Sequence, residues 1–137
     1  MGDRMSYLYT AGATLLALVL LQALTLVVAQ ARVRYHIKAP AVSGNEQFER
    51  TYRVQMNTVE QMAFFLPAMW LCAVLLSDVA AAAGGIIWVI GRTIYAVAYL
   101  NDPAKRGPGA YIASLAQIAL WLGAAAGLVQ AAIRLGP

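Results

Sequence analysis

Charged residues are scarce in this sequence, and the scarcity limits what the chain can be. Only 12% of the 137 residues are Asp, Glu, Lys or Arg, whereas 61% are hydrophobic. A soluble domain contains about 25% charged residues, so the composition excludes an ordinary soluble enzyme and indicates an integral membrane protein. The length leaves room for one domain, which we expect to cover residues 1–137.

The sequence also lacks the residues of several common sites. Its single cysteine, Cys72, lies in an apolar run and cannot form an intrachain disulfide, so we expect a small buried or lipid-facing residue. Its single histidine, His36, has no second metal ligand nearby, so we expect no metal site. There is no Ser/His/Asp set, no phosphate-binding glycine loop and no CxxC pair.

Four apolar runs are each long enough to cross a bilayer, which takes about 20 residues. We expect spans over about residues 5–34, 48–77, 79–101 and 109–134. The first run is too long for the apolar part of a signal peptide, about 7–15 residues, so we interpret it as a span. Gly123-x-x-x-Gly127 in the fourth run is a close-packing pattern. The sequence therefore predicts an all-α membrane protein, a bundle of four transmembrane helices.

Basic residues gather on one side of this predicted bundle. With four spans, the segments 32–47 and 102–108 lie on the same side, which holds Arg32, Arg34, Lys38, Arg50, Arg53, Lys105 and Arg106. The other side holds only Arg4 and Arg134. Because basic residues stay cytoplasmic, we expect this side in the cytoplasm and both termini outside. The net charge of +4 thus suits a membrane surface rather than nucleic acid.

Two spans carry polar stripes near the basic side. At about 100° per residue, the members of each stripe share one helix face: Arg50, Arg53, Asn57 and Glu60 on the second span, and Arg92, Tyr95 and Tyr99 on the third. One carboxylate among several arginines leaves excess positive charge, which a small ligand with carboxylates would balance. The alternatives are snorkelling arginines, an interfacial tyrosine belt, and a structural ion pair between Glu60 and Arg92. In a lone subunit both stripes would face lipid, so we expect them at subunit boundaries.

The same residues carry a resemblance to a known family. Phe48-Glu49-Arg50-x-Tyr52-Arg53-x-Gln55-x-Asn57-x-x-Glu60 is similar to the signature of the MAPEG family, the membrane-associated proteins of eicosanoid and glutathione metabolism. The resemblance extends to Gly91-Arg92-x-x-Tyr95-x-x-x-Tyr99 and to Arg106, and it covers nearly the whole chain. It is closest to the branch that contains leukotriene C4 synthase and microsomal glutathione transferase 2, and the alanine-rich chain with its short loop resembles a bacterial member.

The resemblance implies a homotrimer with glutathione bound between neighbouring subunits at the cytosolic end. The implied glutathione-binding residues are Arg32, Arg53, Gln55, Asn57, Glu60, Arg92, Tyr95 and Tyr99. In this interpretation the arginines pair with carboxylates, Glu60 holds the ammonium group, and the others donate or accept hydrogen bonds. Arg106 matches the arginine that stabilises the thiolate, because an adjacent cation lowers a thiol pKa from about 8.5.

The implied function is that of a membrane-bound glutathione S-transferase. It would conjugate glutathione, as co-substrate, to hydrophobic electrophiles from the bilayer, and it would also reduce lipid hydroperoxides, both as detoxification. Gln61 and Val33 stand where leukotriene C4 synthase has a tyrosine and an arginine, and Gly107 stands where the prostaglandin E synthase branch has a serine. These differences argue against both of those activities.

Two other functions stay open at this point. One is a non-catalytic lipid-binding scaffold of the 5-lipoxygenase-activating-protein type, and the other is a small four-span exporter. The near-complete glutathione set argues against the scaffold, and the uncharged first span argues against the exporter. We expect the protein in a bacterial inner membrane with its active site facing the cytoplasm.

Overall fold

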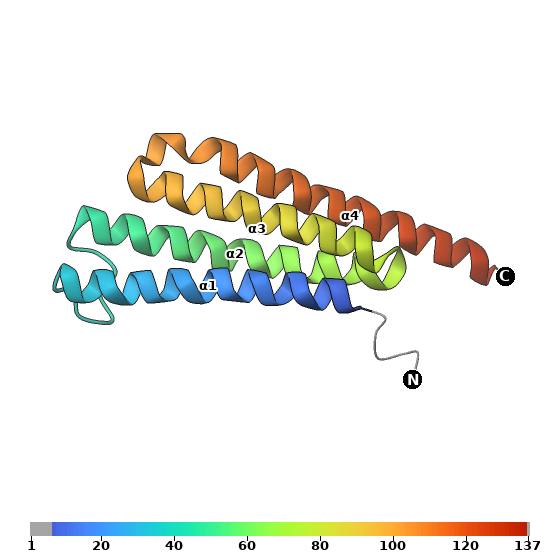
Figure 1. The fold of residues 1–137 in the computed structure, drawn as a ribbon, viewed down its shortest axis with the longest axis horizontal. Coiled ribbons are helices and arrows are strands. Elements are labelled where there is room, and N and C mark those ends of the chain that lie inside the picture. Colours follow the sequence, from blue (N-terminus) through green and yellow to red (C-terminus); the bar gives the residue numbers. More distant parts are fainter. Residues whose placement is uncertain (1–6, 137) are drawn as a thin grey trace.

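The computed structural model describes residues 7–136, which form four long helices joined by short connections (Figure 1). These are α1 (Leu8–Arg34), α2 (Glu46–Leu75), α3 (Asp78–Asn101) and α4 (Gly107–Leu135), with a short 3-10 helix, η2 (Pro103–Arg106), before α4. All four are long and apolar enough to cross a membrane. The predicted all-helical bundle of four spans is confirmed; the expected first residue of the first span, Met5, lies outside the described residues.

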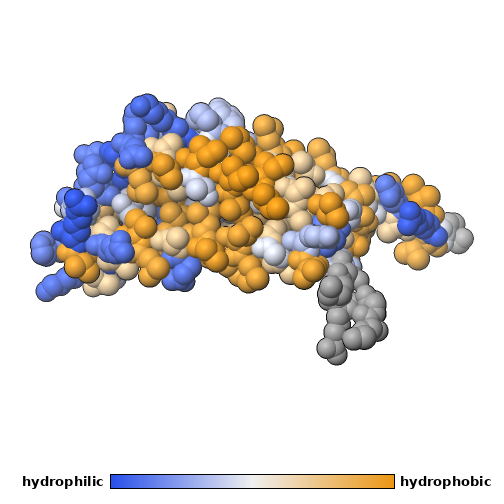
Figure 2. All heavy atoms as spheres, in the orientation of Figure 1, coloured by the Kyte–Doolittle hydropathy of each residue, from blue (hydrophilic) through white to orange (hydrophobic). Residues whose placement is uncertain are grey.

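The helices run alternately up and down. The α1–α2 connection and the α3–α4 turn lie at one end of the bundle, whereas α1 begins and α4 ends at the other (Figure 1). Hydrophilic side chains gather at the end with the two connections, and the middle of the molecule presents a hydrophobic surface (Figure 2). Leu15, Val19, Leu115 and Leu122 are among the exposed apolar side chains of this middle zone. The two basic segments therefore share one end, as predicted.

Side-chain oxygen atoms cap the starts of α1, α2 and α3. The Asn45 side chain accepts hydrogen bonds from two backbone N–H groups at the start of α2, and the Ser77 hydroxyl accepts one from the start of α3. The Asp78 carboxylate accepts from the backbone N–H groups of Tyr9 (3.1 Å) and Thr10 (2.8 Å) in α1. These bonds satisfy N–H groups that lack a partner within their own helix. Asp78 thereby fixes the start of α1 against the α2–α3 turn.

Glycine residues let α4 approach its neighbours closely. A Cβ atom at Gly127 would lie 2.6 Å from the backbone of Leu75 in α2, and one at Gly123 would lie 2.9 Å from Cys72 Sγ. The pattern Gly123-x-x-x-Gly127 is therefore confirmed as a close helix contact. At the polar end, a Cβ atom at Gly109 would overlap the backbone nitrogen of Tyr95 in α3.

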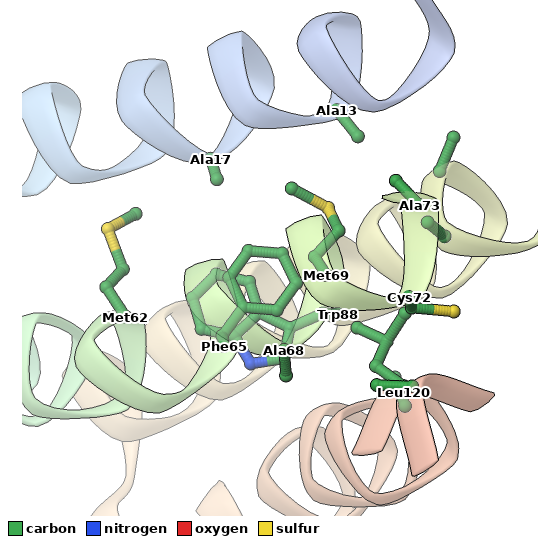
Figure 3. Packing of buried hydrophobic residues seen from close by; sticks show 14 of the residues in the cluster. Ala13, Ala17, Met62, Phe65, Ala68, Met69, Cys72, Ala73, Trp88 and Leu120 are labelled. Atoms are coloured by element: carbon green, nitrogen blue, oxygen red, sulfur yellow. The ribbon is translucent and has the colours of Figure 1, made fainter. Parts of the chain in front are cut away.

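The apolar core lies between the middle of the bundle and the α2–α3 turn (Figure 3). The rings of Phe65 and Trp88 are parallel, with centroids 3.9 Å apart, and small residues of α1 such as Ala17 pack beside them. Cys72 is buried in this core, as expected from its apolar surroundings. The core holds α2 and α3 in fixed positions, and these two helices carry most of the candidate site.

Candidate functional site

A buried arginine on α3 is the centre of the candidate site. Arg92 is 4% exposed, its Nη2 donates a hydrogen bond to Thr58 Oγ1 at 2.8 Å, and its guanidinium carbon lies 4.0 Å from the Tyr95 ring centroid. Its Nε is buried without a hydrogen-bond partner among the described residues. A buried cation without an anion is unfavourable, so this arrangement is suited to binding one.

The structural ion pair between Glu60 and Arg92 is wrong. Glu60 is exposed on α2, and the ion pairs found within residues 7–136 join Arg50 to Glu46 and Lys105 to Asp102. Arg92 is instead satisfied in part by a neutral hydroxyl. Its positive charge stays uncompensated by any described carboxylate.

A chain of contacts leads from Arg92 to the polar end of the bundle. The Tyr95 hydroxyl accepts a hydrogen bond from Asn57 Nδ2 at 2.6 Å, and the Tyr95 and Tyr99 ring centroids are 5.6 Å apart. The guanidinium carbon of Arg106, at the end of η2, lies 5.3 Å from the Tyr99 ring centroid. The structure therefore brings Asn57, Arg92, Tyr95, Tyr99 and Arg106 together along one side of α3.

An open cleft of about 380 Å³ lies beside Tyr99 at this end. Its lining combines two arginines, two carboxylates, aromatic rings and apolar residues: Val42, Glu46, Glu49, Arg50, Tyr52, Arg53, Tyr99 and Pro103. Arg53 is exposed, whereas Arg50 is largely buried and forms an ion pair with Glu46 at 2.9 Å. Arg50 is therefore not an arginine that snorkels into open water.

Two of the predicted binding residues lie on a different side of the subunit. Gln55 Nε2 donates to Thr25 Oγ1 of α1 at 2.9 Å, and it points about 160° away from Arg53 around α2. Arg32 Nη1 donates to the carbonyl oxygen of Ala41 at 2.7 Å, and its guanidinium lies over the Phe48 ring. Arg32 opens onto a separate groove beside His36 and Lys38. Within one subunit, neither of these two residues lines the cleft that Arg53 lines.

We expected both polar stripes to face outward from a lone subunit, and this is wrong for the stripe on α3. Arg53, Glu60 and Phe64 do face outward from α2, with Phe64 56% exposed. Arg92 and Tyr95 are buried within the subunit instead, because Thr58 and Asn57 of α2 provide hydrogen bonds for them there. A tyrosine belt at the membrane surface is thus wrong for Tyr95.

Sequence reasoning missed Thr58, the hydrogen-bond acceptor of Arg92. Its hydroxyl donates to the carbonyl oxygen of Val54 at 2.9 Å and still accepts from Arg92. Thr58 lies about 100° from Asn57 around α2 and so falls outside the polar stripe. The only sequence signal is a hydroxyl within an apolar span. Within residues 7–136, no three His, Cys, Asp or Glu side chains come together as metal ligands would.

Comparison with known proteins identifies the family. The model of the MAPEG family matches residues 10–126. An uncharacterized protein of Synechocystis sp. is 45% identical over 117 residues, which are 85% of this chain and 82% of that protein. Leukotriene C4 synthase of Rattus norvegicus is 32% identical over 109 residues, 80% of this chain and 71% of that protein. Microsomal glutathione S-transferase 2 of Homo sapiens is 34% identical over 82 residues, 60% of this chain and just over half, 56%, of that protein.

The family match spans most of the four helices, each of which can cross a membrane. The protein is accordingly an integral, multi-pass membrane protein. The chain belongs to the MAPEG family.

Proposed function

We propose that the protein is a membrane-bound glutathione S-transferase that conjugates glutathione to hydrophobic electrophiles from the bilayer. One observation carries this proposal: Arg92 is a buried cation that has no anionic partner within residues 7–136, and it is connected through Tyr95 and Tyr99 to a cleft that contains further arginines. Glutathione has two carboxylates, which would supply the missing negative charge. The names of the human and rat relatives, a glutathione S-transferase and leukotriene C4 synthase, support the same class of substrate.

In this proposal the protein binds and orients glutathione, and the nucleophile belongs to the ligand. Arg53 and Arg92 bind carboxylates, Glu60 binds the ammonium group, and Asn57, Tyr95 and Tyr99 provide hydrogen bonds. Arg106 stabilises the thiolate and so raises the fraction of ionised thiol near neutral pH. The thiolate sulfur then forms a bond to the electrophilic carbon, and the leaving group departs with its electron pair.

The same thiolate could serve a second reaction, the reduction of a lipid hydroperoxide. Its sulfur attacks the terminal oxygen and forms a sulfenic acid, the O–O bond breaks, and the lipid leaves as an alkoxide that takes a proton from water to become the alcohol. A second glutathione then converts the sulfenic acid to glutathione disulfide and water. This reaction needs no further group from the protein, so it belongs to the proposal for the same site.

A homotrimer would bring the two sides of the site together. Arg32 and Gln55 lie on one side of the subunit, and Arg53 and Glu60 face another. A head-to-tail interface, repeated until it closes, would bring the first pair of one subunit against the second pair of the next. It would also cover Glu60, whose exposure on a membrane-spanning helix is unfavourable.

Subunit mixing tests this arrangement. Co-expression of Arg32→Ala and Arg53→Ala subunits in equal amounts is expected to restore about a quarter of the wild-type sites, because a site shared by two subunits is intact when an Arg53-containing subunit precedes an Arg32-containing one. The separate variants should be inactive. No recovery in the mixture, or a stable monomer in detergent that binds glutathione, would contradict the shared site.

The catalytic part is tested by conjugation of glutathione to an aryl halide in detergent. Arg106→Ala is expected to lower kcat about 100-fold at neutral pH, and to recover toward pH 9, where the free thiol ionises without help. Lys105→Ala is the matched control. It removes the cation next to Arg106 in η2, and that cation pairs with Asp102 and has no role in the proposed mechanism. If wild type and Arg106→Ala are equally inactive while glutathione still binds, the enzyme proposal fails. If calorimetry shows fatty-acid binding but no glutathione binding, the lipid-binding scaffold replaces it.

We also propose the cellular setting. Basic residues at the end with the α1–α2 and α3–α4 connections favour a cytoplasmic location for that end, with both termini outside. In a bacterial inner membrane this orientation would expose the cleft to cytoplasmic glutathione. Protease protection of tags at the termini in spheroplasts would test the orientation.

A further inference from the structure

Arg50 is a cation of the cleft for which the proposed mechanism has no role. It lies on α2 three residues before Arg53, and both line the cleft beside Tyr99. Its Nη2 lies 2.9 Å from Glu46 Oε1. The Arg50 side chain is only 16% exposed, whereas that of Glu46 is 84% exposed. The arginine is therefore held in the wall of the cleft, and its carboxylate partner lies at the rim in contact with water.

This asymmetry makes the pair easy to exchange. An ion pair four residues apart on a helix shifts an equilibrium by only about two-fold, and the Glu46 side of this pair is open to water. A guanidinium has five N–H donors and binds carboxylates in a bidentate way, so Arg50 can accept an incoming carboxylate while Glu46 moves into water.

Glu49, the other carboxylate that lines the cleft, is held in place by a hydrogen bond, unlike Glu46. Glu49 Oε1 accepts a hydrogen bond from the backbone N–H of Gly44 at 2.9 Å, which ties it to the α1–α2 connection. Arg50 and Arg53 against Glu46 and Glu49 give the lining a formal charge of zero. Neutralising Glu46 would make the lining +1 and leave Arg50 without its partner.

We propose that Arg50 is a further binding residue for a carboxylate of glutathione, and that Glu46 competes with that carboxylate for it. This inference rests on the proposed function, which makes glutathione the ligand of the cleft. The ammonium group assigned to Glu60 and its neighbouring carboxylate belong to the γ-glutamyl end of the ligand. Arg50 lies about 15 Å along α2 from Glu60, toward the polar end of the bundle. It therefore binds the glycine carboxylate, at the opposite end of glutathione from the γ-glutamyl group.

Calorimetric titration of the detergent-solubilised protein with glutathione tests the inference. Glu46→Gln is expected to lower the Kd about two- to five-fold, and this gain should shrink in high salt, because the competing charge is exposed. Arg50→Gln is expected to raise the Kd about ten-fold, as for the loss of a charged hydrogen bond. In the double variant Glu46→Gln should bring no gain, because Glu46 acts only through Arg50.

Glutathione esterified at its glycine carboxylate gives a readout that a structural role would not change. Wild type should bind glutathione more tightly than the ester, and this preference should be clearly smaller in Arg50→Gln. Arg34→Gln is the matched control, because Arg34 is at the same end of the bundle but lines a different groove beside Gln30 and Thr51. It should leave both Kd values unchanged.

The outcomes separate the inference from the proposed function. The inference is overturned if Glu46→Gln does not tighten binding, if it does so equally without Arg50, or if Arg50→Gln prefers glutathione to the ester as strongly as wild type does. Each of these results requires that wild type binds glutathione, and so leaves the proposed function standing. Wild type that binds no glutathione overturns both. The gain expected in Glu46→Gln does not depend on how well Arg50→Gln folds.

Discussion

Replacing Thr58 by valine tests whether Arg92 depends on a single hydroxyl. Threonine and valine have almost the same shape, so the substitution leaves no cavity in a position that is fully buried. It removes the hydroxyl oxygen that accepts a hydrogen bond from Arg92 Nη2 at 2.8 Å. Nη2 of the buried Arg92 would then lose this partner.

The expected loss follows from that contact. A hydrogen bond to a charged group contributes about 1.5–3 kcal/mol, and the loss is felt in full when the remaining partner stays buried. At about 3 °C per kcal/mol for a chain of this size, the melting temperature in detergent should fall by about 5–9 °C. Under the proposed function, saturating glutathione should stabilise Thr58→Val more than wild type, since a carboxylate at Arg92 would replace the lost acceptor.

Thr93→Val is the matched control. Thr58 lies in α2 and Thr93 in α3. Each hydroxyl donates to the carbonyl oxygen four residues earlier, Thr58 to Val54 at 2.9 Å and Thr93 to Val89 at 2.8 Å. Only Thr58 also accepts from Arg92, and Thr93 is exposed. Thr93→Val should therefore lie close to wild type. Equal melting temperatures for the two variants would refute the claim that Thr58 stabilises the buried arginine.

Three further predictions follow from packing and capping. Gly109→Ala should lower the free energy of unfolding by about 1–3 kcal/mol because its Cβ would overlap the backbone of α3, whereas Gly107→Ala, whose nearest neighbour is an aromatic carbon at 3.7 Å, should be close to neutral; equal thermal unfolding would contradict this. Asp78→Ala should speed hydrogen exchange at the start of α1 because two backbone N–H groups lose their acceptor, and unchanged exchange would show that the cap is unimportant. Cys72 should resist N-ethylmaleimide in the folded protein and react after unfolding; rapid labelling of the folded protein, seen by intact mass, would contradict its burial.

The four spans could be predicted from the sequence because they depend on properties of single segments. Length and apolar content fix where a helix can cross a bilayer, and the number of spans fixes which connections share an end. Where α2 and α3 begin depends on the capping residues Asn45 and Ser77, which are also local features of the sequence. None of these features needs knowledge of which helix packs against which.

The surroundings of Arg92 could not be predicted in this way. The helical period shows that Arg92 and Tyr95 share a face of α3, but not whether that face points to lipid or to another helix. In the structure α3 packs against each of the other three helices, so this face is covered. Its partner Thr58 lies off the polar stripe of α2, and only the relative rotation of the two helices brings them within hydrogen-bond distance.

Residues that are close together in the sequence of α2 face different sides of the helix. Arg53 and Gln55 are two residues apart, yet a helix turns them about 160° from each other, and Gln55 is bonded to Thr25 of α1. Both can contact one ligand only if that ligand lies between two copies of the chain. Either the site is shared between subunits, or Gln55 and Arg32 belong to the packing of α1 on α2 and not to the site. The mixing of Arg32→Ala and Arg53→Ala subunits decides between these two arrangements, because only a shared site regains activity when neither subunit carries both arginines.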